Sequence, residues 1–112
     1  MKNLTNTVQL IGRLGNDPKI KTFDSGKSMA TFSLATNETY TNNKGEKVDD
    51  TQWHNVVVWG NKVKVVEQYL LKGKQVAVSG KLVNRSYENK EGEKRYITEV
   101  QLNELLMLGS NG

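Results

Sequence analysis

The sequence has 112 residues, close to the usual size of a single domain and long enough to bury one modest core. It contains no cysteine, which excludes disulfides, thiolate nucleophiles and cysteine-based zinc sites. Lys and Arg (16) outnumber Asp and Glu (12), and the resulting net charge of +4 weakly favours a polyanionic partner.

Alternation of apolar and polar residues predicts strands in the first half of the chain. The expected strands are Thr7–Arg13, a short second piece at Lys19–Phe23, then Ser28–Thr36 and Thr51–Gly60. Residues 15–18, Gly-Asn-Asp-Pro, are typical of a tight turn. Ala30, Phe32 and Leu34 share one face of their strand and are candidates for the core. The polar segment Asn42–Asp50 predicts a mobile loop.

One helix is expected, at Asn61–Lys72, because Val63, Val66 and Leu70 recur at helical spacing. Asn61 is a plausible N-cap, and Gly73 fits the position that follows a helix. Two long strands, Lys74–Tyr87 and Lys94–Leu106, close the chain around a turn at residues 89–92. The order indicates an all-β fold, and the first candidate is the OB fold, a five-stranded Greek-key barrel with one helix between strands 3 and 4.

The strand Thr51–Gly60 carries both tryptophans of the chain. Its alternation places Trp53 and Trp59 on one face, and His54, Val56 and Val58 on the other. Branched valines favour the core, so both indoles are expected to point outward. Two interpretations follow: the indoles seal an interface, or they form a platform on which unpaired bases stack.

Cations interleaved with further rings favour the stacking interpretation. Tyr40 and Tyr87 join Trp53 and Trp59 as candidate base-stacking residues, whereas Tyr87 and Tyr96 also fit ordinary cross-strand pairing. The candidate phosphate contacts are Arg13, Lys21, Lys44, Lys47, Lys62, Lys81, Arg85 and Arg95. The helix is only mildly basic, unlike the recognition helix of a duplex reader.

The sequence contains no recognisable catalytic or metal-binding constellation. His54 is expected to be a hydrogen-bonded core or interface histidine, and a single histidine without cysteine makes no ordinary zinc site. Asp49 and Asp50 are interpreted as a solvated turn. No phosphate-binding loop has the required spacing, and no nucleophile, base and orienting group assemble. We therefore expect a binding protein with no cofactor, no metal and no enzymatic activity.

The stretches VQLIGRLGNDP, ATFSLATNETY, TQWHNVVVWGN, EQYLLKGKQVAVSGKL and RYITEVQLNE resemble, in order, the bacterial single-stranded DNA-binding protein family. The resemblance implies an OB fold, a homotetramer, and sequence-independent binding and protection of single-stranded DNA in replication, recombination and repair. Trp53 matches a stacking tryptophan of the family, and Trp59 falls where the family often has Phe. Tyr40 and Tyr87 fall where many members have Trp. Subunit contacts are implied for Asn6, Val8, His54 and Gln75.

Residues 1–108 are expected to form the DNA-binding domain, and residues 109–112 a disordered stub of a C-terminal tail that is absent here. Family members usually continue into a flexible linker with an acidic tip, so recruitment of genome-maintenance proteins is expected only if such a tip exists beyond residue 112. No apolar run approaches the about 20 residues that span a bilayer, and Thr and Gln interrupt any signal-like segment. The expected location is therefore cytoplasmic, at the nucleoid.

Three other functions stay open at this stage. One is a dimeric OB-fold module for replication restart or RNA binding. The second is an OB-type nuclease, which would need clustered carboxylates, whereas the acidic residues here are scattered. The third is a structural subunit whose aromatic face binds protein.

Overall fold

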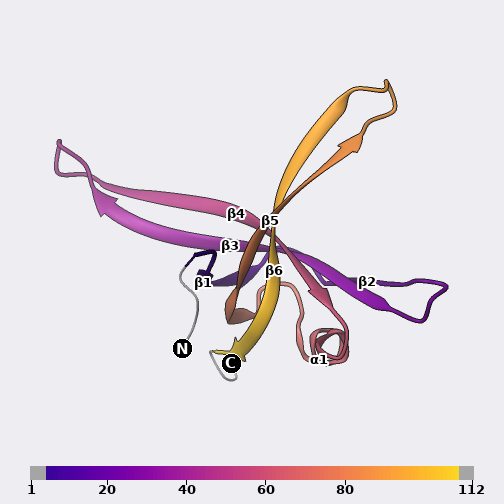
Figure 1. The fold of residues 1–112 in the computed structure, drawn as a ribbon. Coiled ribbons are helices and arrows are strands. Elements are labelled where there is room, and N and C mark those ends of the chain that lie inside the picture. Colours follow the sequence, from indigo (N-terminus) through magenta and orange to yellow (C-terminus); the bar gives the residue numbers. More distant parts are fainter. Residues whose placement is uncertain (1–4, 109–112) are drawn as a thin grey trace.

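The computed structural model describes residues 5–108, which form six strands and one short helix (Figure 1). The expected tail stub at 109–112 lies outside the described residues. The elements in chain order are β1 Val8–Leu14, β2 Lys19–Thr22, β3 Ser28–Thr41, β4 Lys47–Trp59, α1 Lys62–Tyr69, β5 Gln75–Glu88 and β6 Lys94–Met107.

Five of these strands close into a barrel. The sheet order is β1-β5-β6-β4-β3-β2, and an additional pairing of β1 with β3 completes the ring. That closing pairing sets Arg13 opposite Ala35 and Leu14 opposite Leu34. β2 pairs with the N-terminal part of β3 and is not one of the five strands of the ring. Among the ring strands α1 follows the third, β4, and precedes the fourth, β5, so the prediction of an OB barrel with this helix position is confirmed.

The core contains the residues that alternation predicted. Ala30, Phe32 and Leu34 of β3 face Val56 and Val58 of β4, and all five are buried. The rest of the buried cluster comes from the other ring strands, from α1 and from the residue directly after α1: Leu14, Val63, Val66, Leu70, Val76, Val78, Val100 and Leu102. Val63 and Val66 of the helix and Leu70 directly after it thus pack into the core, and these are the three residues that the periodicity indicated.

The helix is shorter than predicted. It ends at Tyr69, and Leu70 is already extended (φ −98°, ψ 133°) while its N–H still bonds to the Val66 carbonyl. Asn61 is the N-cap residue, as predicted, but it has helical dihedrals and its side chain makes no cap hydrogen bond. Gly73 is not the residue that follows the helix; its φ of 88° lets the chain turn back so that its N–H bonds to Leu14 of β1 (2.8 Å). Contacts to β1 therefore decide where the helix stops.

The predicted loop at Asn42–Asp50 is a short turn followed by strand from Lys47 onward. β3 runs to Thr41 and β4 starts at Lys47, so the two strands form an arm that projects from the barrel (Figure 1). Asp49 and Asp50 lie in β4 and accept hydrogen bonds from Thr39 and Gln52, rather than forming a turn. Both faces of this arm are exposed, so apolar alternation could not reveal it.

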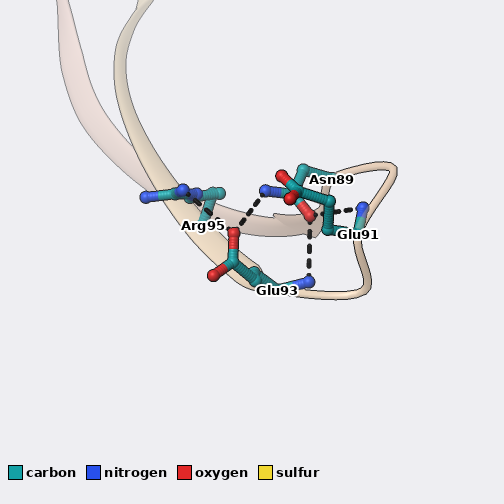
Figure 2. A network of polar contacts seen from close by, with 4 residues as sticks. All are labelled: Asn89, Glu91, Glu93 and Arg95. Carbon is teal, nitrogen blue, oxygen red and sulfur yellow. Dashed lines mark hydrogen bonds and ion pairs between the residues drawn. The ribbon is translucent and has the colours of Figure 1, made fainter.

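β5 and β6 form a second projecting arm, and the two arms share one turn design. In the second turn Asn89 accepts hydrogen bonds from the N–H groups of Glu91 and Glu93 and donates to the Glu93 carboxylate (Figure 2). Asn42 makes the equivalent bonds in the first turn. Gly45 and Gly92 both adopt positive φ, which closes each turn. The arms raise the radius of gyration to 16.2 Å, against about 13 Å for a compact chain of this size.

Candidate nucleic-acid interface

Both indoles point away from the barrel core, as predicted. Trp53 is 63% exposed and Trp59 44%, whereas Val56 and Val58 on the opposite face are fully buried. Val57 shares the outer face with the tryptophans yet is buried, because it lies at the bottom of a groove bordered by Trp59, Val83 and Arg85. The outer face of β4 is therefore partly concave.

Trp53 rests on the turn that connects β1 and β2. A Cβ atom added to Gly15 would lie 2.3 Å from Cζ3 of the indole, so the ring occupies space that only glycine leaves free. Asn16 holds this turn in place, because its side-chain oxygen accepts hydrogen bonds from the N–H and the hydroxyl of Ser33. One side of the indole is thus supported by backbone while much of the ring stays open to solvent. The sequence predicted only a turn at Gly15, not a contact with Trp53.

Trp59 belongs to a small aromatic and cationic stack. Its ring lies 5.8 Å from that of Phe23, at an interplanar angle of 20°. The Lys21 ammonium lies 5.0 Å from the centre of the Phe23 ring. Phe23 was not among the predicted stacking residues, although its place two residues after Lys21 could have suggested it. The stack braces Trp59 and sets a cation beside it.

The β5–β6 arm brings Tyr87 and Arg85 to the same outer face. Alternation places Val83, Arg85 and Tyr87 together, and Arg85 lines one groove with Lys21 and Trp59. The Arg85 guanidinium donates two hydrogen bonds to the Glu99 carboxylate, from Nε to Oε1 at 2.9 Å and from Nη2 to Oε2 at 3.1 Å. This carboxylate raises the pKa of Arg85 above its usual value, through the hydrogen bonds and through charge attraction.

The other predicted cations are spread around this face. Arg13 lies in a cross-strand row with Ala35 and Trp53, and its guanidinium donates to the Gly73 carbonyl. Lys81 pairs with Gln101, which itself pairs with Val57 of β4, so Lys81 belongs to the outer face. The remaining four lie further out: Lys44 and Lys47 at the end of the first arm, Lys62 at the start of α1, and Arg95 opposite Tyr87 in the second arm.

Tyr40 and Tyr96 are not brought together with the tryptophans. Tyr40 pairs with Val48 on the first arm, about 17 Å along the strand from the row that holds Trp53. It is five residues from Ala35, an odd number, so it lies on the other face of the arm. Tyr96 likewise alternates with Arg95 to the opposite face of the second arm, where the Lys94 ammonium lies 5.9 Å from its ring centre. Exposed rings therefore occupy more than one face.

The predicted subunit residues have the following positions. The His54 ring is half-buried and shares a hydrogen bond of 3.1 Å with the Thr36 hydroxyl, which confirms the prediction of a hydrogen-bonded histidine. The Asn6 amide donates to the Leu82 carbonyl and accepts from its N–H. Val8 packs against the core, and Gln75 is half-buried at the start of β5. Their contact with another subunit stays a prediction.

An exposed apolar row crosses β1, β5 and β6 and was not predicted. Ile11 of β1, Ala77 of β5 and Leu106 of β6 pair side by side, and the two large side chains are exposed. Within residues 5–108, no cluster of three or more His, Asp or Glu side chains is arranged to hold a metal ion. No helix in this part of the chain has the length and apolar character needed to cross a membrane.

Comparison with known proteins gives one consistent result. The model of the single-strand binding protein family matches residues 5–108. The single-stranded DNA-binding protein 1 of Chlorobaculum tepidum is 43% identical over 94% of this chain, and that of Neisseria meningitidis serogroup A, named single-stranded DNA-binding protein, is 38% identical over 93%. The chain spans 65% and 60% of these relatives, which is less than two thirds of their length. Among solved structures, a Plasmodium falciparum SSB complex with ssDNA superposes with a TM-score of 0.88 at 37% identity, covering 97% of this chain and 99% of that one.

Proposed function

The chain belongs to the single-strand binding protein family, and from this we propose that it binds and protects single-stranded DNA, without sequence preference, in replication, recombination and repair. The observation that carries the proposal is the outer face of β4, where two exposed indoles lie beside cations of three other strands. We therefore propose that this face binds the DNA strand and does not cleave it.

The rings select single strands over duplex. In a duplex the faces of the bases are already stacked, whereas an unpaired base can lie on an indole for about 1–3 kcal/mol, whatever its identity. Trp53, Trp59 and Tyr87 are the proposed central stacking residues, and Tyr40 a further one on the first arm. The eight-residue helix α1 packs on the barrel through Val63 and Val66, whereas a major-groove reader presents a longer helix to the duplex.

Phosphate neutralisation supplies the rest of the affinity. Around the rings we propose phosphate contacts from Arg13, Lys21, Lys44, Lys47, Lys62, Lys81 and Arg95, whereas the eighth predicted cation, Arg85, is already held by the Glu99 carboxylate. Because each neutralised phosphate of a single strand releases counterions, the logarithm of the affinity falls by about 0.7 for each tenfold rise in salt and each phosphate contacted. Rings and cations together explain binding that follows the strand and does not read its sequence.

We also propose that the active form is a cytoplasmic homotetramer. Its contacts would include Asn6, Val8, His54 and Gln75, and the apolar row of Ile11, Ala77 and Leu106 offers surface that a second copy could cover. Recruitment of other genome-maintenance proteins belongs to the proposal only for a chain that carries an acidic segment beyond residue 112.

The test uses the intrinsic fluorescence of the two tryptophans, both of which lie on the proposed face. Titration with oligo-dT at low salt is expected to quench the emission strongly, and a duplex of equal length to quench it weakly. Equal or stronger quenching by the duplex, or none by oligo-dT, contradicts the proposal. Light scattering alongside gives the number of subunits; a dimer that prefers RNA in competition would favour the replication-restart or RNA-binding alternative.

A further inference from the structure

Arg85 differs from the other cations of the outer face because both oxygens of one carboxylate, that of Glu99, accept hydrogen bonds from its guanidinium. Its two hydrogen bonds to Glu99 are parallel and engage both carboxylate oxygens. The two side chains come from neighbouring strands, β5 and β6, and lie diagonally across the ladder. They line the same two grooves, one shared with Trp59 and Lys21 and the other with Asn55 and Lys19. The pair therefore lies in the middle of the proposed DNA-binding face.

The two partners differ in exposure. The Arg85 side chain is 54% exposed, whereas that of Glu99 is only 12% exposed. If Arg85 swung out to a phosphate, a nearly buried carboxylate would lose its partner, which is strongly unfavourable. Arg85 is thus held flat on the face, with two of its five N–H donors engaged by Glu99 and three still available.

We propose, resting on the proposed function above, that Arg85 and Glu99 act toward DNA as one uncharged unit. The fixed guanidinium plane stacks on a base and donates its free N–H groups, while Glu99 keeps it from neutralising a phosphate. Planar guanidinium groups stack well on aromatic rings, and a neutral pair releases no counterion from the DNA. Glu99 is then a positioning residue that sets how strongly binding depends on salt.

The second arm carries a natural comparison. Arg95 donates a single hydrogen bond of 3.2 Å to Glu93, and these side chains are 56% and 58% exposed (Figure 2). Water screens such a pair, so Arg95 is free to leave Glu93 for a phosphate. Glu93→Gln changes the net charge by the same amount as Glu99→Gln, in the turn directly before β6, and serves as the matched control.

The experiment measures the affinity for oligo-dT between 0.05 and 0.3 M salt in wild type, Glu99→Gln, Arg85→Gln/Glu99→Gln and Glu93→Gln. Glu99→Gln frees Arg85, so its log–log salt slope is expected to steepen by about 0.7. Over this sixfold drop in salt its affinity then rises about 3.5-fold more than that of wild type. The double variant binds more weakly, yet its slope equals that of wild type, because both lack a free charge at this place. Glu93→Gln also keeps the wild-type slope.

The opposite pattern overturns the inference. If Arg85 contacts a phosphate in wild type, the double variant has a slope shallower than wild type by about 0.7, and Glu99→Gln leaves the slope unchanged. A second measurement is made on the wild-type protein. The Arg85 Nε–H signal in its NMR spectrum is assigned by its loss in Arg85→Gln, and it is expected to keep its salt-bridged position when oligo-dT is added. Loss of that position also overturns the inference. Failure of the proposed function is distinct, since wild type would then not bind oligo-dT at all.

Discussion

Trp53→Ala is expected to weaken oligo-dT binding by about 1–3 kcal/mol, roughly 5- to 150-fold, while the barrel stays folded. The indole lies on the outer face, opposite the buried valines, and rests on Gly15 instead of filling the core. Its removal takes away a stacking surface but leaves no cavity inside. Fluorescence anisotropy of a labelled oligo-dT measures the affinity, and urea unfolding measures the stability.

Two variants control for loss of an aromatic residue in general. Trp53→Phe keeps a smaller ring in the same place and is expected to bind with intermediate affinity. Tyr69→Ala removes an exposed ring from the end of α1, outside the strands that form the proposed face, and is expected to bind like wild type. If Trp53→Ala lost its fold, or Tyr69→Ala lost as much affinity, the assignment of the outer face would be wrong.

Leu34→Ala is expected to show the reverse behaviour: a loss of about 2–5 kcal/mol in the free energy of unfolding, with little change in DNA affinity where the protein is folded. Leu34 is fully buried, lies opposite His54 on β4, and is among the largest of the fully buried side chains. Alanine leaves a cavity that a closed five-stranded barrel cannot collapse around easily. Such a loss is a large part of the 5–15 kcal/mol that stabilises a typical domain.

Urea unfolding at one fixed protein concentration measures this effect, since subunit association would make the midpoint depend on concentration. Anisotropy with oligo-dT well below the unfolding midpoint gives the affinity of the folded variant. A stability loss no greater than that of Trp53→Ala would contradict the assignment of inner and outer faces. Together the two variants separate what folds the barrel from what binds the strand.

Sequence alternation was sufficient wherever one face of a strand is buried. Phe32, Leu34, Val56 and Val58 were correctly assigned to the core, because side chains two residues apart on a strand share one face. The same rule failed beyond the barrel, at Lys47–Asp50, where both faces are exposed and no apolar period remains. The helix end was also missed, because contacts with β1 and the turn before β2 decide it.

The parts of the candidate interface that escaped prediction depend on contacts between distant segments. The seat of Trp53 on Gly15 and the stacking of Trp59 on Phe23 each join residues 36 or more positions apart, and neither follows from a local pattern. In the sequence, nothing distinguishes Glu99 from any other carboxylate on a predicted strand. Only the register of β5 and β6 shows that it engages Arg85, and alternation along the arm shows that Tyr40 lies apart from Trp53.

The most direct test of the central claim is ultraviolet cross-linking of the wild-type protein to oligo-dT, followed by mass spectrometry of the modified peptides. Five exposed rings can then cross-link to the DNA in the same experiment. Three belong to the proposed face (Trp53, Trp59 and Tyr87), and two do not (Tyr69 and Tyr96). Cross-links are expected at Trp53, Trp59 and Tyr87, with Trp53 prominent. Cross-links at Tyr69 or Tyr96 with none at Trp53 would contradict it, and would place the strand on another face of the barrel.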